Sequence, residues 1–154
     1  MKIKIAWVGK TKEPAIQSLT DEYLKKISRY AQVEGLEQRD EAAVLQTSGR
    51  ATRGRRGKTS SNKSTLVLLD SRGKLLSSED WARFLGDYQD RNPLPLVFAV
   101  GPSDGFTEAA RGAAQHAISL GRITIAHELA RVVLLEQIYR GFTILKGHPY
   151  HLGH

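Results

Sequence analysis

Residues 98–106 have the sequence FAVGPSDGF, in which a short apolar run ends at a glycine-rich corner. With Leu96 and Val97 before it, the run has the length and composition of a buried strand. Strands in the middle of parallel sheets are apolar throughout because helices cover both faces. Glycines at the corner either satisfy turn geometry or let a ligand approach the backbone. The stretch therefore predicts a buried strand with a possible ligand site at its end.

The rest of the chain repeats an alternation of strands and helices. Pro14 suits the first turn of a helix, and Ser77 followed by Asp80 is typical of a capping box. Residues 71–74 have turn composition. The expected strands are 3–8, 33–38, 65–70, 96–100 and 118–125, and the expected helices are 14–30, 40–46, 78–88, 107–117 and 128–143. This order predicts one α/β domain over residues 1–154, with a mainly parallel sheet and helices on both faces.

Three expected strand ends carry residues suited to a ligand site. They are Leu69-Asp70, Val100-Gly101-Pro102 and Leu120-Gly121-Arg122. In open parallel sheets, ligands bind beyond the carboxyl ends of the strands, where the loops diverge. No Gly-x-Gly-x-x-Gly fingerprint for a dinucleotide follows any of these strands.

The positive charge is concentrated in one segment. The formal net charge is +7, and residues 49–63 hold six Lys or Arg and no acid. The stretch 48–64 lacks apolar periodicity, so we expect a mobile basic loop. Such a loop favours binding of a polyanion, of which RNA is the commonest in a cytoplasm, although a solvated loop without a partner has the same composition. Its cations are Arg50, Arg53, Arg55, Arg56, Lys58 and Lys63.

Composition excludes several classes of site. The chain has no cysteine, which removes disulfides and thiolate metal sites and is compatible with a cytoplasmic location. No apolar run has the roughly 20 residues that a membrane span requires. His127-Glu128 resembles the start of a zinc-protease helix, but Arg131 stands where the second histidine is needed. We therefore expect no membrane and no metal.

The end of the chain combines an apolar helix with a histidine-containing tail. Apolar residues between 129 and 142 occupy more than one helix face, which predicts burial against the sheet and against a second subunit. Glu136 and Arg140 have the spacing of an ion pair. The tail His148-Pro149-Tyr150-His151 has no obvious packing purpose, which favours a role in a site over a frayed terminus.

The run from Arg131 to Phe142, RVVLLEQIYRGF, and the terminal HPYH closely resemble the end of the RlmH family. The resemblance extends over the whole chain, including the first strand and residues 68–74. RlmH proteins are SPOUT-superfamily methyltransferases that act on N3 of a pseudouridine in large-subunit (23S) ribosomal RNA. Two departures are Pro102, where the family commonly has a second glycine, and Leu152-Gly153-His154, where it usually ends in a basic residue.

The resemblance implies a C-terminal trefoil knot, a homodimer and S-adenosylmethionine as the cofactor. It also implies that the protein acts on the ribosome, with the basic loop contacting phosphates. For this reaction we nominate Tyr150 and His151 to contact the base, and Arg131 to position it or stabilise charge. The residues that match the family's cofactor-binding positions are Leu69, Gly101, Leu120, Gly121, Arg122, Ile123, Thr124 and Ile125.

Two other functions stay open. The chain could keep the fold without catalysis, as an RNA-binding or ribosome-assembly protein. It could also be a SPOUT methyltransferase for another RNA site.

Overall fold

The computed structural model describes residues 1–49 and 63–151, with only the backbone of His151. Each strand is followed by a helix, and all strand pairs are parallel. The strands are β1 (Lys2–Val8), β2 (Gln32–Gln38), β3 (Thr65–Leu75), β4 (Leu96–Val100) and β5 (His116–Ser119), in the sheet order β2-β1-β4-β3-β5. The helices are α1 (Pro14–Ile27), α2 (Glu41–Thr47), α3 (Ser78–Arg91), α4 (Glu108–Ala113) and α5 (His127–Leu145), and a short 3₁₀ helix, η1 (Pro149–His151), ends the described chain.

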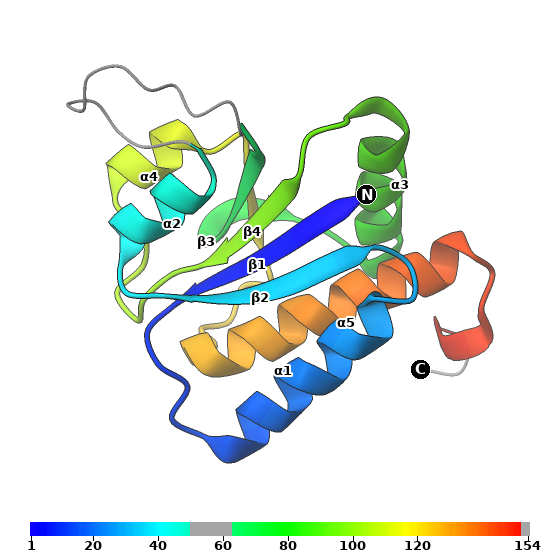
Figure 1. The fold of residues 1–154 in the computed structure, drawn as a ribbon, viewed down its shortest axis with the longest axis horizontal. Coiled ribbons are helices and arrows are strands. Elements are labelled where there is room, and N and C mark those ends of the chain that lie inside the picture. Colours follow the sequence, from blue (N-terminus) through cyan, green and yellow to red (C-terminus); the bar gives the residue numbers. More distant parts are fainter. Residues whose placement is uncertain (50–62, 152–154) are drawn as a thin grey trace.

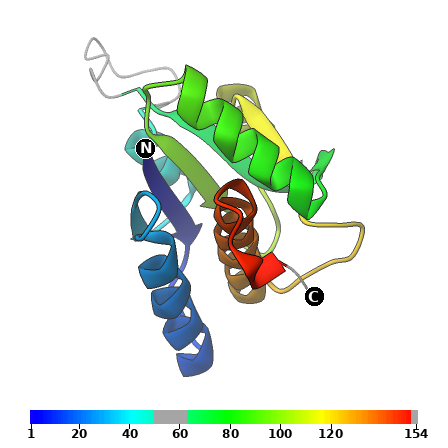
Figure 2. The ribbon, with the colours of Figure 1, turned by 90° about the vertical axis from the view of Figure 1, so that its right-hand side faces the viewer.

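Helices cover both faces of the sheet, as predicted (Figure 1). In the central strand β4 all five residues are buried, and successive side chains enter opposite faces. Phe98 packs in the cluster formed with α1, α3 and α5, whereas Val97 and Ala99 pack with α2 and α4. Figure 2 shows α1, α5 and α3 together on one face of the sheet. The apolar run that begins the 98–106 stretch is therefore the middle of a three-layer core.

The wide apolar surface of helix α5 packs against neighbours in its own chain. It lies between α1 and α3 on the sheet. Gly141 permits close packing on α3, because a Cβ there would lie 2.9 Å from a methyl carbon of Leu85. Burial on several sides, predicted from the helix pattern, is thus provided by α1 and α3 as well as the sheet.

The predicted turn at residues 71–74 is wrong, because β3 continues through it to Leu75. The strand shifts register between Leu69 and Lys74 and then pairs again with Ile118 and Ser119 of β5. Gly73 permits this approach, since a Cβ there would lie 2.5 Å from the backbone nitrogen of Ile118. Turn composition is equally suited to a strand irregularity, where glycine removes a steric clash.

Two further boundaries differ from the sequence prediction. The helix expected over 107–117 ends at Ala113, and the strand expected over 118–125 spans only His116–Ser119. The chain from Leu120 to Ala126 is a loop between β5 and α5. Its β-branched residues suggested a strand, but no neighbouring strand pairs with them in the described residues. This loop becomes a wall of the site described next.

No helix in the described residues is long and apolar enough to span a bilayer. Residues 50–62 and 152–154 lie outside the description, so the expected mobile loop and most of its cations lie there too. Lys63 is described and is exposed.

Candidate functional site

A cavity of about 710 Å³ opens beyond the carboxyl ends of β4 and β5, beside the irregularity of β3 at residues 69–72. The connection after β4 leads to α4 on one face of the sheet, and the connection after β5 leads to α5 on the other. Chain segments that diverge to opposite faces leave a crevice between them, which is where open α/β sheets bind ligands. The cavity lies in this crevice and is lined by residues from all three places expected as strand ends, although β3 itself continues past Asp70.

Seven of the eight residues expected to bind the cofactor line this one cavity. The exception is Arg122, which is exposed on the same loop. Gly121 has a positive φ of 145°, a conformation that favours glycine, and the Ser119 hydroxyl accepts from its amide and donates to its carbonyl oxygen. The seven residues are Leu69, Gly101, Leu120, Gly121, Ile123, Thr124 and Ile125.

The glycine-rich corner forms the opposite wall of the cavity. Its turn is closed by a hydrogen bond from the Gly105 amide to the Pro102 carbonyl oxygen, with Gly105 at a φ of 85°. Gly101 lies against the buried Phe106 ring, because a Cβ there would be 3.0 Å from a ring carbon. Gly101 therefore serves packing of the corner whether or not a ligand approaches it.

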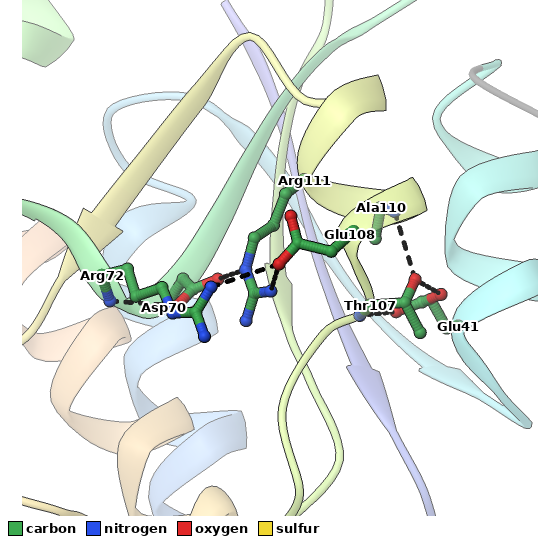
Figure 3. A network of polar contacts seen from close by, with 7 residues as sticks. All are labelled: Glu41, Asp70, Arg72, Thr107, Glu108, Ala110 and Arg111. Carbon is green, nitrogen blue, oxygen red and sulfur yellow. Dashed lines mark hydrogen bonds and ion pairs between the residues drawn. The ribbon is translucent and has the colours of Figure 1, made fainter.

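A polar network holds this wall to the neighbouring elements (Figure 3). The Arg111 Nε of α4 donates to Asp70 Oδ2 at the irregularity of β3, at 2.6 Å. Glu41 of α2 accepts from the Thr107 amide and hydroxyl, at 2.8 and 2.6 Å. Burial raises the pKa of Asp70, but hydrogen bonds from the Arg72 amide and the Arg111 guanidinium outweigh it and hold that pKa below 3.8.

Arg72 and Arg111 were not predicted as site residues, and Asp70 was predicted only as part of a strand end suited to a ligand, yet all three line the cavity. The sequence predicted Asp70 at the end of a strand and Arg72 in a turn. Arg111 lies 41 residues after Asp70, so only the fold brings the two together. The only sequence feature that pointed to any of these residues was the acidic side chain of Asp70 at an expected strand end.

Arg131 is buried rather than exposed to the cavity. Its side chain is 1% exposed, and its guanidinium carbon lies 4.0 Å from the centre of the Trp7 ring. Its Nη1 donates to the hydroxyls of Thr11 and Thr20, at 2.8 and 3.4 Å. Burial lowers the pKa of Arg131, although Glu128 and Glu37 act in the opposite direction. Its neighbours on α5, His127 and Ala130, do line the cavity.

Tyr150 lies at the other end of α5 from the cavity. Its ring packs edge-on against Tyr139, with centroids 4.8 Å apart, and Arg140 lies over it at 5.0 Å. Arg140 is held by Glu136 through the predicted ion pair, at 2.6 Å. Tyr139 lies nine residues after Ala130, the last α5 residue that lines the cavity, which is about 14 Å along the helix axis, so Tyr150 does not reach the cavity of its own chain. Figure 1 shows η1 beside the C-terminal end of α5. The His151 side chain lies outside the described residues.

A family model described as "Predicted SPOUT methyltransferase" matches residues 1–151. The chain belongs to the SPOUT methyltransferase family. The resemblance to the RlmH branch is confirmed by relatives that match along their full length. A protein of Koribacter versatilis named ribosomal RNA large subunit methyltransferase H is 52% identical over 154 residues, covering all of both chains. A protein of the same name from Geobacter sp. (strain M21) is 45% identical over 152 residues, covering 98% of this chain and 99% of its own.

The fold of this SPOUT methyltransferase also matches a solved structure. A probable methylase family protein from Haemophilus influenzae Rd KW20 superposes with a TM-score of 0.56 at 10% identity, covering 97% of this chain and 68% of its own. At that identity the match supports the fold alone. Within the part of the chain that is described, no three metal-binding side chains gather at one place.

Proposed function

We propose that this protein transfers a methyl group from S-adenosylmethionine to N3 of a pseudouridine in large-subunit ribosomal RNA, acting in the cytoplasm. The observation that carries the proposal is the cavity, which gathers seven of the eight expected cofactor residues in a chain of this family. A relative that is 52% identical is named as a methyltransferase of large-subunit ribosomal RNA. The trefoil knot belongs to the same proposal.

The residues present suit such a cofactor. The cavity volume of about 710 Å³ lies within the usual range for small-molecule sites. Apolar side chains such as Leu69 and Ile125 offer surface for the adenine ring, and the loop between β5 and α5 offers backbone groups for hydrogen bonds. When bound, the cofactor supplies an electrophilic methyl group.

The protein would orient the base and help to remove its N3 proton. Burial and a hydrogen bond with Tyr23 raise the pKa of Tyr150 well above its ordinary value of 10. The phenol therefore stays protonated at neutral pH, so we assign Tyr150 to stacking or hydrogen-bond donation rather than to proton removal. His151 remains the candidate for proton removal. Arg131 would act as a positioning residue, by holding the α5 turn that carries His127 and Ala130 into the cavity wall.

The location of Tyr150 also supports the proposed homodimer. If the tail contributes to catalysis, it must reach a cavity other than the one at the far end of its own α5 helix. A second copy provides that cavity, with the tail of each subunit serving the site of the other. Exposed apolar residues beside the cavity favour such a partner, since Ile123 is 74% and Leu129 is 47% exposed.

The proposal is tested by incubating the purified protein with ribosomes and methyl-labelled S-adenosylmethionine. We expect label in large-subunit RNA, and mass spectrometry of its nucleosides to give N3-methylpseudouridine. Label at another nucleoside would favour the alternative of a different RNA site. Cofactor binding without transfer, or RNA binding alone, would favour a non-catalytic protein. Ribosomal RNA from a deletion strain should lack the same modification.

A further inference from the structure

Two arginines converge on one carboxylate oxygen at the rim of the cavity. Glu108 Oε1 lies 3.2 Å from Arg72 Nη1 and 2.7 Å from Arg111 Nη1 (Figure 3). Arg72 comes from β3 and Arg111 from α4, and both line the cavity. The position of this oxygen is thus one where two guanidinium groups from different elements can hold a single anion.

A buried carboxylate fixes the geometry of this pair. The Asp70 side chain is only 4% exposed and accepts from Arg111 Nε at 2.6 Å, which leaves Arg111 Nη1 directed toward Glu108. The second Asp70 oxygen accepts from the Arg72 amide at 3.0 Å, which fixes the backbone that carries the other arginine. The Arg111 guanidinium therefore keeps its position without Glu108, and the backbone at Arg72 is fixed beside it.

Glu108 is easily replaced as the bound anion. Its side chain is 80% exposed and that of Arg72 is 70% exposed. Exposed ion pairs of this kind contribute little to stability, so rotating Glu108 into solvent costs little. A phosphate group offers more acceptor oxygens than one carboxylate and suits the planar fork of arginine.

We propose that Arg72 and Arg111 bind a backbone phosphate of the RNA substrate, with a phosphate oxygen in the place of Glu108 Oε1. The contact would hold the nucleotide chain at the mouth of the cavity and thereby position the base. This assignment rests on the proposed function, because it takes RNA as the substrate. The same chemistry could bind the carboxylate of S-adenosylmethionine, and the test separates these two ligands.

The test measures binding of purified ribosomes to the protein and its variants over a range of KCl concentrations. In Arg72→Gln we expect affinity to fall and the slope of log K against log salt to decrease by about 1, as for loss of one phosphate contact. In Glu108→Gln we expect tighter binding, because the competing anion is neutralised. Arg83→Gln is the matched control, since Arg83 is 71% exposed and paired with Asp80 on α3.

An unchanged salt slope in Arg72→Gln, or weaker binding in Glu108→Gln, would overturn the assignment. Calorimetry with S-adenosylmethionine identifies the alternative ligand, because a loss of cofactor affinity in Arg72→Gln would assign the pair to the cofactor carboxylate instead. If the proposed function fails but the assignment holds, the wild-type protein transfers no methyl group. The slope of log K against log salt still decreases in Arg72→Gln.

Discussion

At the scale of single residues, Asp70 joins two elements that line the cavity. It holds β3 to α4 through Arg111 and also accepts from the Arg72 amide. A carboxylate that accepts several charge-assisted hydrogen bonds is stabilised in its ionised form. Its contribution to folding should therefore depend on pH.

We expect Asp70→Asn to lower the free energy of unfolding at pH 7 by about 1–3 kcal/mol, because the ion pair with Arg111 is lost. The folded pKa lies below the usual 3.8, so the stabilisation is complete above that value and is lost as pH falls through the folded pKa. Urea unfolding of both proteins between neutral and strongly acidic pH measures this. The exposed Asp90 on α3 provides the control Asp90→Asn. A difference in stability that stayed constant into strong acid would contradict the assignment.

Single residues also show where sequence reasoning stops. The capping box at Ser77 and Asp80 is local and was predicted, as was the ion pair between Glu136 and Arg140. The burial of Arg131 against Trp7 could not be predicted, because the two residues are 124 positions apart and a polar residue type gave no signal for the core. Long-range pairs of this kind arise from the fold alone.

At the scale of elements, the strands were predictable where apolar runs are buried on both faces. β1 and β4 follow from such runs, whereas the β3 irregularity and the loop after β5 do not. In those two places the local composition is compatible with more than one structure. Pairing with the neighbouring strands determines which structure forms. The consequence is testable at Gly73.

We expect Gly73→Ala to destabilise the protein by about 1–3 kcal/mol, because its methyl group would overlap the backbone of Ile118 and separate β3 from β5. Gly112→Ala is the matched control, since a Cβ on this α4 glycine meets nothing within 4 Å. Alanine there should leave stability unchanged or raise it by up to about 1 kcal/mol. Thermal unfolding compares the two, and equal stability would refute the close approach of β3 and β5.

At the scale of the whole molecule, the three places predicted as strand ends do meet at one cavity, although β3 continues beyond the first of them. Parallel strands with diverging connections explain why this could be foreseen. The distance between Tyr150 and the cavity could not be predicted from the sequence, because it depends on the length and direction of α5. It makes a specific prediction for the proposed homodimer.

Two inactive variants should complement each other if tails serve the partner's cavity. We pair a tail variant, Tyr150→Ala with His151→Ala, with the cavity-filling variant Ala130→Phe. After subunit exchange, one intact site per mixed dimer should restore about a quarter of wild-type methyl transfer. No recovery after exchange verified by native mass spectrometry would show that each tail serves its own chain, or none.

The central claim is that the cavity beside the β3 irregularity and the ends of β4 and β5 binds the methyl donor. Calorimetric titration with S-adenosylmethionine tests it most directly, using wild type, Ala130→Phe inside the cavity and Ala109→Phe on the exposed surface of α4. The account predicts binding by wild type and Ala109→Phe, with affinity reduced about tenfold or more in Ala130→Phe, a loss of at least about 1.4 kcal/mol. Wild type that does not bind the cofactor, or a folded Ala130→Phe that binds it as tightly as wild type, would contradict it.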